Sequence, residues 1–215
     1  MGKIVLATII ISGSAKWLLK VGGNKEKWYG SDRIFMYVMT VFGAMTVNYS
    51  EQCTEYGWVV SNLRLLAGCL LAGGLLSAAY MDRRNCWVYN YVWWWCLPWA
   101  GILGMTAGGE FSGIVAVVVF VMLQQLLFSR MYGKADCHAF SVCALAECGN
   151  AVGMVGFLLQ MFLSVVLLTI VQLFRGNVTP RGRLREPQPF IPYIITAFFS
   201  VMFLESVFRT TYIYA

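Results

Sequence analysis

Long apolar runs, separated by short polar and charged breaks, account for most of the 215-residue chain. A helix that crosses the hydrocarbon core of a bilayer needs about 20 predominantly apolar residues. Several of the runs approach this length, whereas the breaks between them are too short to form a soluble domain. The pattern predicts an all-α polytopic membrane protein with about eight transmembrane helices, one of them short, over residues 4–20, 34–50, 58–81, 87–107, 112–130, 137–148, 151–174 and 190–208.

Composition supports this class and gives a simple domain organisation. The chain is 59% hydrophobic and 12% charged, with a mean hydropathy of +0.67, whereas soluble domains carry about 25% charged residues. Residues 1–33 are expected to form an N-terminal membrane anchor followed by a short basic cytoplasmic loop, and residues 34–215 a membrane-embedded domain. The first run lacks a clear small-residue cleavage site, so it is expected to be retained. An interfacial amphipathic helix is the alternative for this run.

Basic residues set the predicted orientation. The net charge is +6, but the basic residues cluster in loops and do not form the continuous groove that nucleic acid requires. Cytoplasmic loops of membrane proteins are enriched in lysine and arginine. With eight alternating spans, thirteen of the sixteen basic residues fall on one side, which is therefore expected to be cytoplasmic: Lys16, Lys20, Lys25, Lys27, Arg33, Arg83, Arg84, Arg130, Lys134, Arg175, Arg181, Arg183 and Arg185.

Two aspartates return to this same side. Asp82 ends the third predicted span and Asp136 precedes the sixth, so two crossings separate them. From Asp136 to Cys148 a helix rises roughly 20 Å, which is less than the hydrocarbon thickness of about 30 Å. Asp136 is therefore expected slightly below the cytoplasmic surface. An ionisable group at membrane depth is a functional candidate.

The paired carboxylates suggest a chemistry, but each residue also has a structural alternative. When two carboxylates share a low-dielectric site, one keeps a proton, so the pair offers a general base toward water and a general acid toward a carbonyl. Such a pair hydrolyses a peptide bond without a metal. Alternatively, Asp82 belongs to a solvated charge cluster with Arg83 and Arg84, and Asp136 caps the helix that follows it.

Three segments resemble the type IV prepilin peptidases, which are membrane aspartyl proteases with a G-x-G-D motif. The segment "GKAD", containing Gly133, Lys134, Ala135 and Asp136, matches that motif with alanine in place of the second glycine. The segment "DRRNCWVYN" matches the surroundings of the family's first aspartate, with Asp82 followed eight residues later by Asn90. The segment "REPQPFIPYIITAFF" is similar to the proline-bracketed start of the last span. The resemblance implies that Asp82 and Asp136 are catalytic.

Two departures from the family pattern surround Asp136. Ala135 is tolerable unless its position needs a positive φ, which only glycine adopts readily. His138 stands where the family commonly has lysine. It is either a cation beside the carboxylates, which would make the site sensitive to pH near neutrality, or a helix-end residue without a role.

Cysteine usage indicates no metal site and no cofactor. The seven cysteines form no C-x-x-C pair, and their odd number argues against a disulfide framework. One histidine without a nearby ligand cluster does not make a zinc site. Longer members of the family carry a cytoplasmic domain with two C-x-x-C pairs, and the corresponding place in this chain has no cysteine. The resemblance therefore implies a minimal peptidase.

The expected function is removal of the short basic leader from a prepilin-like protein whose apolar N-terminal helix lies in the bilayer. The resemblance implies a multi-pass protein of the bacterial plasma (inner) membrane, with its active site facing the cytoplasm, and no nucleic acid as partner. The alternative is a non-enzymatic membrane protein, either a small transporter that uses the paired carboxylates or an inactive scaffold. Glu147 and Glu205 fall near the outer ends of predicted spans and are expected at the membrane interface.

Overall fold

The chain folds as a bundle of helices in the computed structural model, which describes residues 2–23, 30–52, 57–106, 111–127, 133–148, 153–175 and 188–214. Within these ranges there are eight helices and no strand, and each predicted segment overlaps one of them. This confirms the all-α class. The helices are α1 (Gly2–Val21), α2 (Gly30–Gln52), α3 (Trp58–Asn85), α4 (Asn90–Thr106), α5 (Phe111–Leu127), α6 (Lys134–Glu147), α7 (Gly153–Phe174) and α8 (Ile191–Tyr214).

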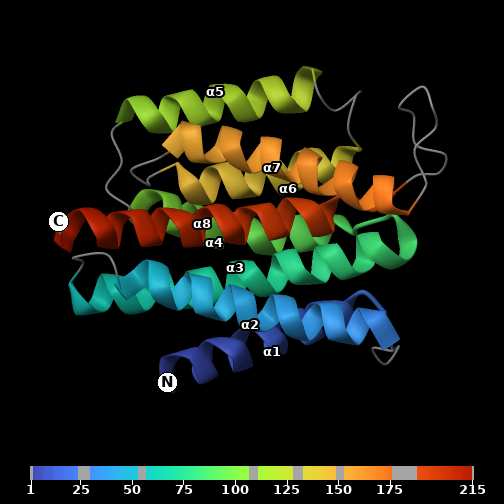
Figure 1. The fold of residues 1–215 in the computed structure, drawn as a ribbon, viewed down its shortest axis with the longest axis horizontal. Helices are drawn as coiled ribbons and strands as arrows, with labels where there is room; N and C mark the ends of the chain where they lie inside the picture. The colour runs from blue at the N-terminus through green and yellow to red at the C-terminus, as the bar shows by residue number, and fades with distance from the viewer. Residues whose placement is uncertain are drawn as a thin grey trace.

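The helices lie side by side along the long axis of the molecule, with α1 and α2 at one edge and α5 at the opposite edge (Figure 1). Two of them are central. Helix α3 packs against α1, α2, α4 and α8, and α6 packs against α4, α5, α7 and α8. The two central helices therefore share α4 and α8 as neighbours, and they carry the two candidate aspartates.

Four helices of the described ranges are long and apolar enough to cross a membrane: Gly2–Val21, Trp58–Asn85, Met154–Phe174 and Ile191–Phe208. Helix α5 contributes a shorter apolar stretch, Gly113–Leu127. Helix α6 has only 14 residues, a rise of about 21 Å. The length and apolar composition of these helices indicate a membrane protein.

Small residues make the central position of α3 possible. Gly68, Ala72, Gly73, Ala78 and Ala79 are all buried in this helix. A Cβ atom added to Gly68 would stand 2.7 Å from Cγ1 of Val47 on α2, closer than van der Waals contact allows. Small residues let helix backbones approach closely in membranes. The small-residue spacing of α3 thus serves packing within one chain.

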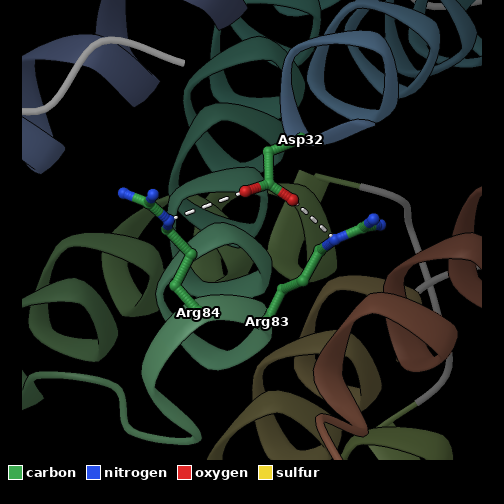
Figure 2. Close-up of polar contacts among 3 residues, drawn as sticks. All are labelled: Asp32, Arg83 and Arg84. Carbon is green, nitrogen blue, oxygen red and sulfur yellow. Dashed lines mark ion pairs between the residues drawn. The ribbon is translucent and has the colours of Figure 1, made fainter. Parts of the chain in front are cut away.

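Helix α3 ends beside the start of α2, and an ion-pair cluster joins the two. Cys86 follows the last turn with φ of 50°, and its N–H donates to the carbonyl oxygen of Asp82 at 2.8 Å. In Figure 2 the Asp32 carboxylate of α2 lies between two arginines, with Arg83 Nε 2.8 Å from one oxygen and Arg84 Nε 3.6 Å from the other. The arginines are therefore ion-paired in the last turn of α3.

Candidate active site

Asp82 lies in the last turns of α3 and caps the start of α8. Its side chain is only 6% exposed, and its Oδ2 accepts the backbone N–H of Ile191 at 3.0 Å. The first N–H groups of a helix have no partner within the helix. The partial positive charge of this helix end stabilises a negative charge placed there. The sequence Phe190–Ile191–Pro192 thus gives the Asp82 carboxylate a polar anchor inside the bundle.

The next backbone positions in the first turn of α8 either lack an N–H group or donate it within the same turn. Pro192 has no N–H to satisfy. The N–H groups of Tyr193 and Ile194 donate to the Phe190 carbonyl oxygen at 3.0 and 3.3 Å. Asp82 therefore accepts an N–H at the start of α8 that has no acceptor within the helix.

Asp136 lies in the first turn of α6, three residues after the N-cap Gly133. Its Oδ2 accepts the Gly133 backbone N–H at 3.2 Å, so the side chain reaches back over the start of its own helix. This position precedes the predicted span 137–148. The pKa of Asp136 is raised to about 7, mainly by burial and further by the negative charge of Asp82, against the lowering effect of the Gly133 N–H.

The start of α8 brings the two aspartates to one region. Phe190, next to the residue that Asp82 holds, packs its ring edge-on to Phe140 of α6, with centroids 5.9 Å apart. Phe140 lies one turn after Asp136 on the same face of α6, because residues four apart stack along a helix. Asp82 also acts electrostatically on Asp136. The two carboxylates therefore lie within electrostatic reach of each other in the folded chain.

The motif residues around Asp136 belong to a regular helix. Lys134 is exposed, and Ala135 is half-buried and packs against the core. Cys86 is the only non-glycine residue with a positive φ in the described ranges, so Ala135 has an ordinary helical backbone that accepts a Cβ. Gly133 is extended, with φ of −61°, and a Cβ there would stand 3.2 Å from Asp136 Oδ2. Gly133 therefore leaves room for the carboxylate.

His138 and Asn90 line a separate cavity between α4 and α6. The cavity has a volume of about 330 Å³ and is otherwise mostly apolar, with Trp93 and Ser141 among its lining residues. The His138 ring lies 6.0 Å from that of Trp93, and its Nδ1 is 3.5 Å from Gln125 Nε2. Because His138 is two residues after Asp136, it points to another face of the helix. This arrangement favours the alternative without a catalytic role for His138.

Glu147 and Arg64 are buried polar residues that the sequence did not reveal. Glu147, expected at the interface, is 3% exposed inside the bundle, and its carboxylate oxygens have no hydrogen-bond partner among the described residues. It shares a small cavity with Arg64, whose Nη1 donates to the Leu103 carbonyl oxygen and to Thr106 Oγ1, each at 3.0 Å. Glu147 follows Asp136 by eleven residues, three helical turns, and this spacing places both on the inward face of α6.

The part of the chain that the structure describes contains no set of metal ligands. No group of three or more histidine, cysteine, aspartate or glutamate side chains there is arranged to hold an ion. Cys69, Cys96, Cys137, Cys143 and Cys148 are buried, as expected for cysteine used as a small apolar residue.

Comparison with known proteins found no relative of the chain. No family model, no curated protein and no solved structure matches it. The resemblance to the type IV prepilin peptidases therefore depends on the three motif segments alone. Residues 185–187 of the third segment lie outside the described ranges, as do Lys25, Lys27, Arg130, Arg181 and Arg183 of the predicted cytoplasmic side.

Proposed function

We propose that the chain is a membrane aspartyl endopeptidase that removes the short basic leader from type IV prepilin-like proteins. In this proposal all eight helices are embedded in the plasma membrane of a bacterium, and the Asp82–Asp136 pair faces the cytoplasm. The single observation that carries the proposal is the interacting pair of half-buried and buried aspartates at the ends of α3 and α6. The three motif segments supply the substrate class.

The environments of the two aspartates support different roles. Burial disfavours a charge on Asp82, but the Ile191 N–H that it accepts and the positive end of α8 both counteract this effect. Burial, together with the negative charge of Asp82, raises the pKa of Asp136, which favours its protonated form. Asp82 is then the general base and Asp136 the general acid.

Hydrolysis follows from these roles. Asp82 removes a proton from water while the water oxygen attacks the carbonyl carbon of the scissile peptide bond. Asp136 donates its proton to the carbonyl oxygen, which gives a neutral tetrahedral diol. The C–N bond then breaks as the diol returns one proton to Asp136 and the proton held by Asp82 moves to the leaving nitrogen. Both aspartates regain their starting protonation states, and one water is consumed.

Co-expression with candidate prepilin-like proteins tests the proposal. Leader removal is scored by gel mobility, and the new N-terminus is identified by mass spectrometry, with an empty vector as control. We expect cleavage after the basic leader, unchanged by EDTA. Absence of processing for every candidate substrate would favour the non-enzymatic alternative. Inhibition by EDTA that added zinc reverses would contradict the metal-free mechanism.

A further inference from the structure

A second cavity with different chemistry lies beside the start of α8. Its volume is about 450 Å³, and its lining residues include Phe35, Arg83, Val171, Arg175, Gln188 and Tyr193. They come from α2, the end of α3, the end of α7, the segment that leads into α8 and the first turn of α8. We name this cavity the arginine pocket. None of the described residues that line it is acidic.

The pocket lies where a membrane surface is expected. Helices α3, α7 and α8 are each long and apolar enough to cross a bilayer. Arg83 is in the last turn of α3, Arg175 directly follows α7, and Gln188 lies three residues before the start of α8. The three helix ends thus meet at one end of the bundle, where a bilayer spanned by these helices would place its headgroups.

Neighbouring residues fix one of the two guanidinium groups. Arg83 Nε lies 2.8 Å from Asp32, and its guanidinium carbon lies 5.0 Å above the Phe35 ring. In Figure 2 its two terminal nitrogens point away from Asp32. Asp32 also contacts Arg84, and Arg83 itself lines the pocket. Arg175 is exposed and adds a second positive charge at the pocket.

The pocket is amphipathic as well as basic. Phe35 and Val171 give it apolar walls, while Gln188 and Tyr193 add hydrogen-bonding groups beside the arginines. Outside it, Ile34 on α2 is 67% exposed and Phe174 on α7 is 89% exposed. Such residues are suited to contact acyl chains. A phosphate group between two guanidiniums, with acyl chains along the apolar residues, matches this distribution.

We propose that the arginine pocket binds the headgroup phosphate of an anionic phospholipid. Basic pockets between transmembrane helices recognise such headgroups, because guanidinium groups donate charge-assisted hydrogen bonds to phosphate oxygens. The basic leader of the proposed substrate carries the same charge as the pocket and is repelled by it. The inference does not depend on the peptidase activity, and each can fail without the other.

Native mass spectrometry of the purified full-length chain in neutral detergent tests the inference. Phosphatidylglycerol and phosphatidylcholine are titrated separately against wild type, Arg175→Gln, Arg175→Lys and Lys20→Gln. Lys20 is a matched control, because it is exposed in the last turn of α1 at the same end of the bundle. We expect wild type to retain phosphatidylglycerol over phosphatidylcholine. One basic residue near the surface changes affinity for anionic lipid about fivefold.

Arg175→Gln should therefore bind phosphatidylglycerol about fivefold more weakly, whereas Arg175→Lys and Lys20→Gln should stay near wild type. Equal losses for Arg175→Gln and Lys20→Gln would show only a general charge effect and overturn the site. Equal retention of both lipids would overturn it as well. A separate titration with inorganic phosphate distinguishes the source of the anion: displacement of phosphatidylglycerol at millimolar phosphate would assign the pocket to free phosphate.

Discussion

Replacement of Asp82 tests whether this residue holds the start of α8, separately from any catalytic role. Asp82→Ala leaves the Ile191 N–H, which belongs to a fully buried residue, without an acceptor. An unsatisfied buried donor costs about 1–3 kcal/mol. Loss of the negative charge at the helix N-terminus adds about 0.3–1 kcal/mol. We therefore expect Asp82→Ala to lower the free energy of unfolding by about 1–4 kcal/mol.

Asp82→Asn separates the two contributions. The amide oxygen of asparagine still accepts the Ile191 N–H, so only the charge contribution is lost, about 1 kcal/mol or less. Reversible unfolding in mixed micelles, followed by circular dichroism, measures both variants. Asp32→Asn is the control, because its ion pairs are partly exposed and such pairs contribute about 0–1 kcal/mol. Equal stabilities of Asp82→Ala and Asp82→Asn would refute the capping role.

Three further predictions concern α6. Ala135→Gly should lower stability by about 1 kcal/mol and leave leader cleavage near wild type, whereas Ala135→Val should slow cleavage about tenfold through overpacking; equal cleavage rates would contradict this. Because the folded-state pKa of Asp136 is raised from 3.8 to about 7, the folded protein binds more protons between these values. The free energy of unfolding should therefore fall as pH rises across that window, and cleavage should fall as pH rises through about 7; Asp136→Asn should flatten the stability profile, and an unchanged slope would argue against the shift. Glu147→Met should raise the free energy of unfolding by about 1–3 kcal/mol, because it removes buried oxygens without hydrogen bonds; a less stable variant would reveal an undetected partner for Glu147.

Apolar periodicity predicted the helices well because each run is bounded by polar residues that are costly to bury in lipid. Boundaries were less accurate. Helix α3 continues to Asn85, beyond the predicted residue 81, so Asp82 belongs to the helix itself. The capping of α8 by Asp82 joins residues 109 positions apart, and no local pattern in the sequence encodes such a contact.

Helical geometry explains which residues of α6 share the face of Asp136 and which do not. His138 and Asp136 are close in the motif, yet a two-residue spacing places them on different faces once the segment is helical. Glu147 shares the face of Asp136, and the eleven-residue spacing was a usable signal for its burial. Its position inside the bundle, however, depends on the packing of α6 against four other helices. That packing is a tertiary property, which the apolar runs do not specify.

Leader cleavage by Asp82→Asn and Asp136→Asn is the measurement that tests the shared catalytic pair most directly. Each variant is co-expressed with a substrate that the wild type processes, and membrane insertion is verified for every protein. Glu147→Gln is the matched control, because it replaces another buried carboxylate on the same face of α6. The account predicts that both aspartate variants lose cleavage while Glu147→Gln retains it. Processing at a near wild-type rate by either Asp82→Asn or Asp136→Asn would contradict the pair as the catalytic centre.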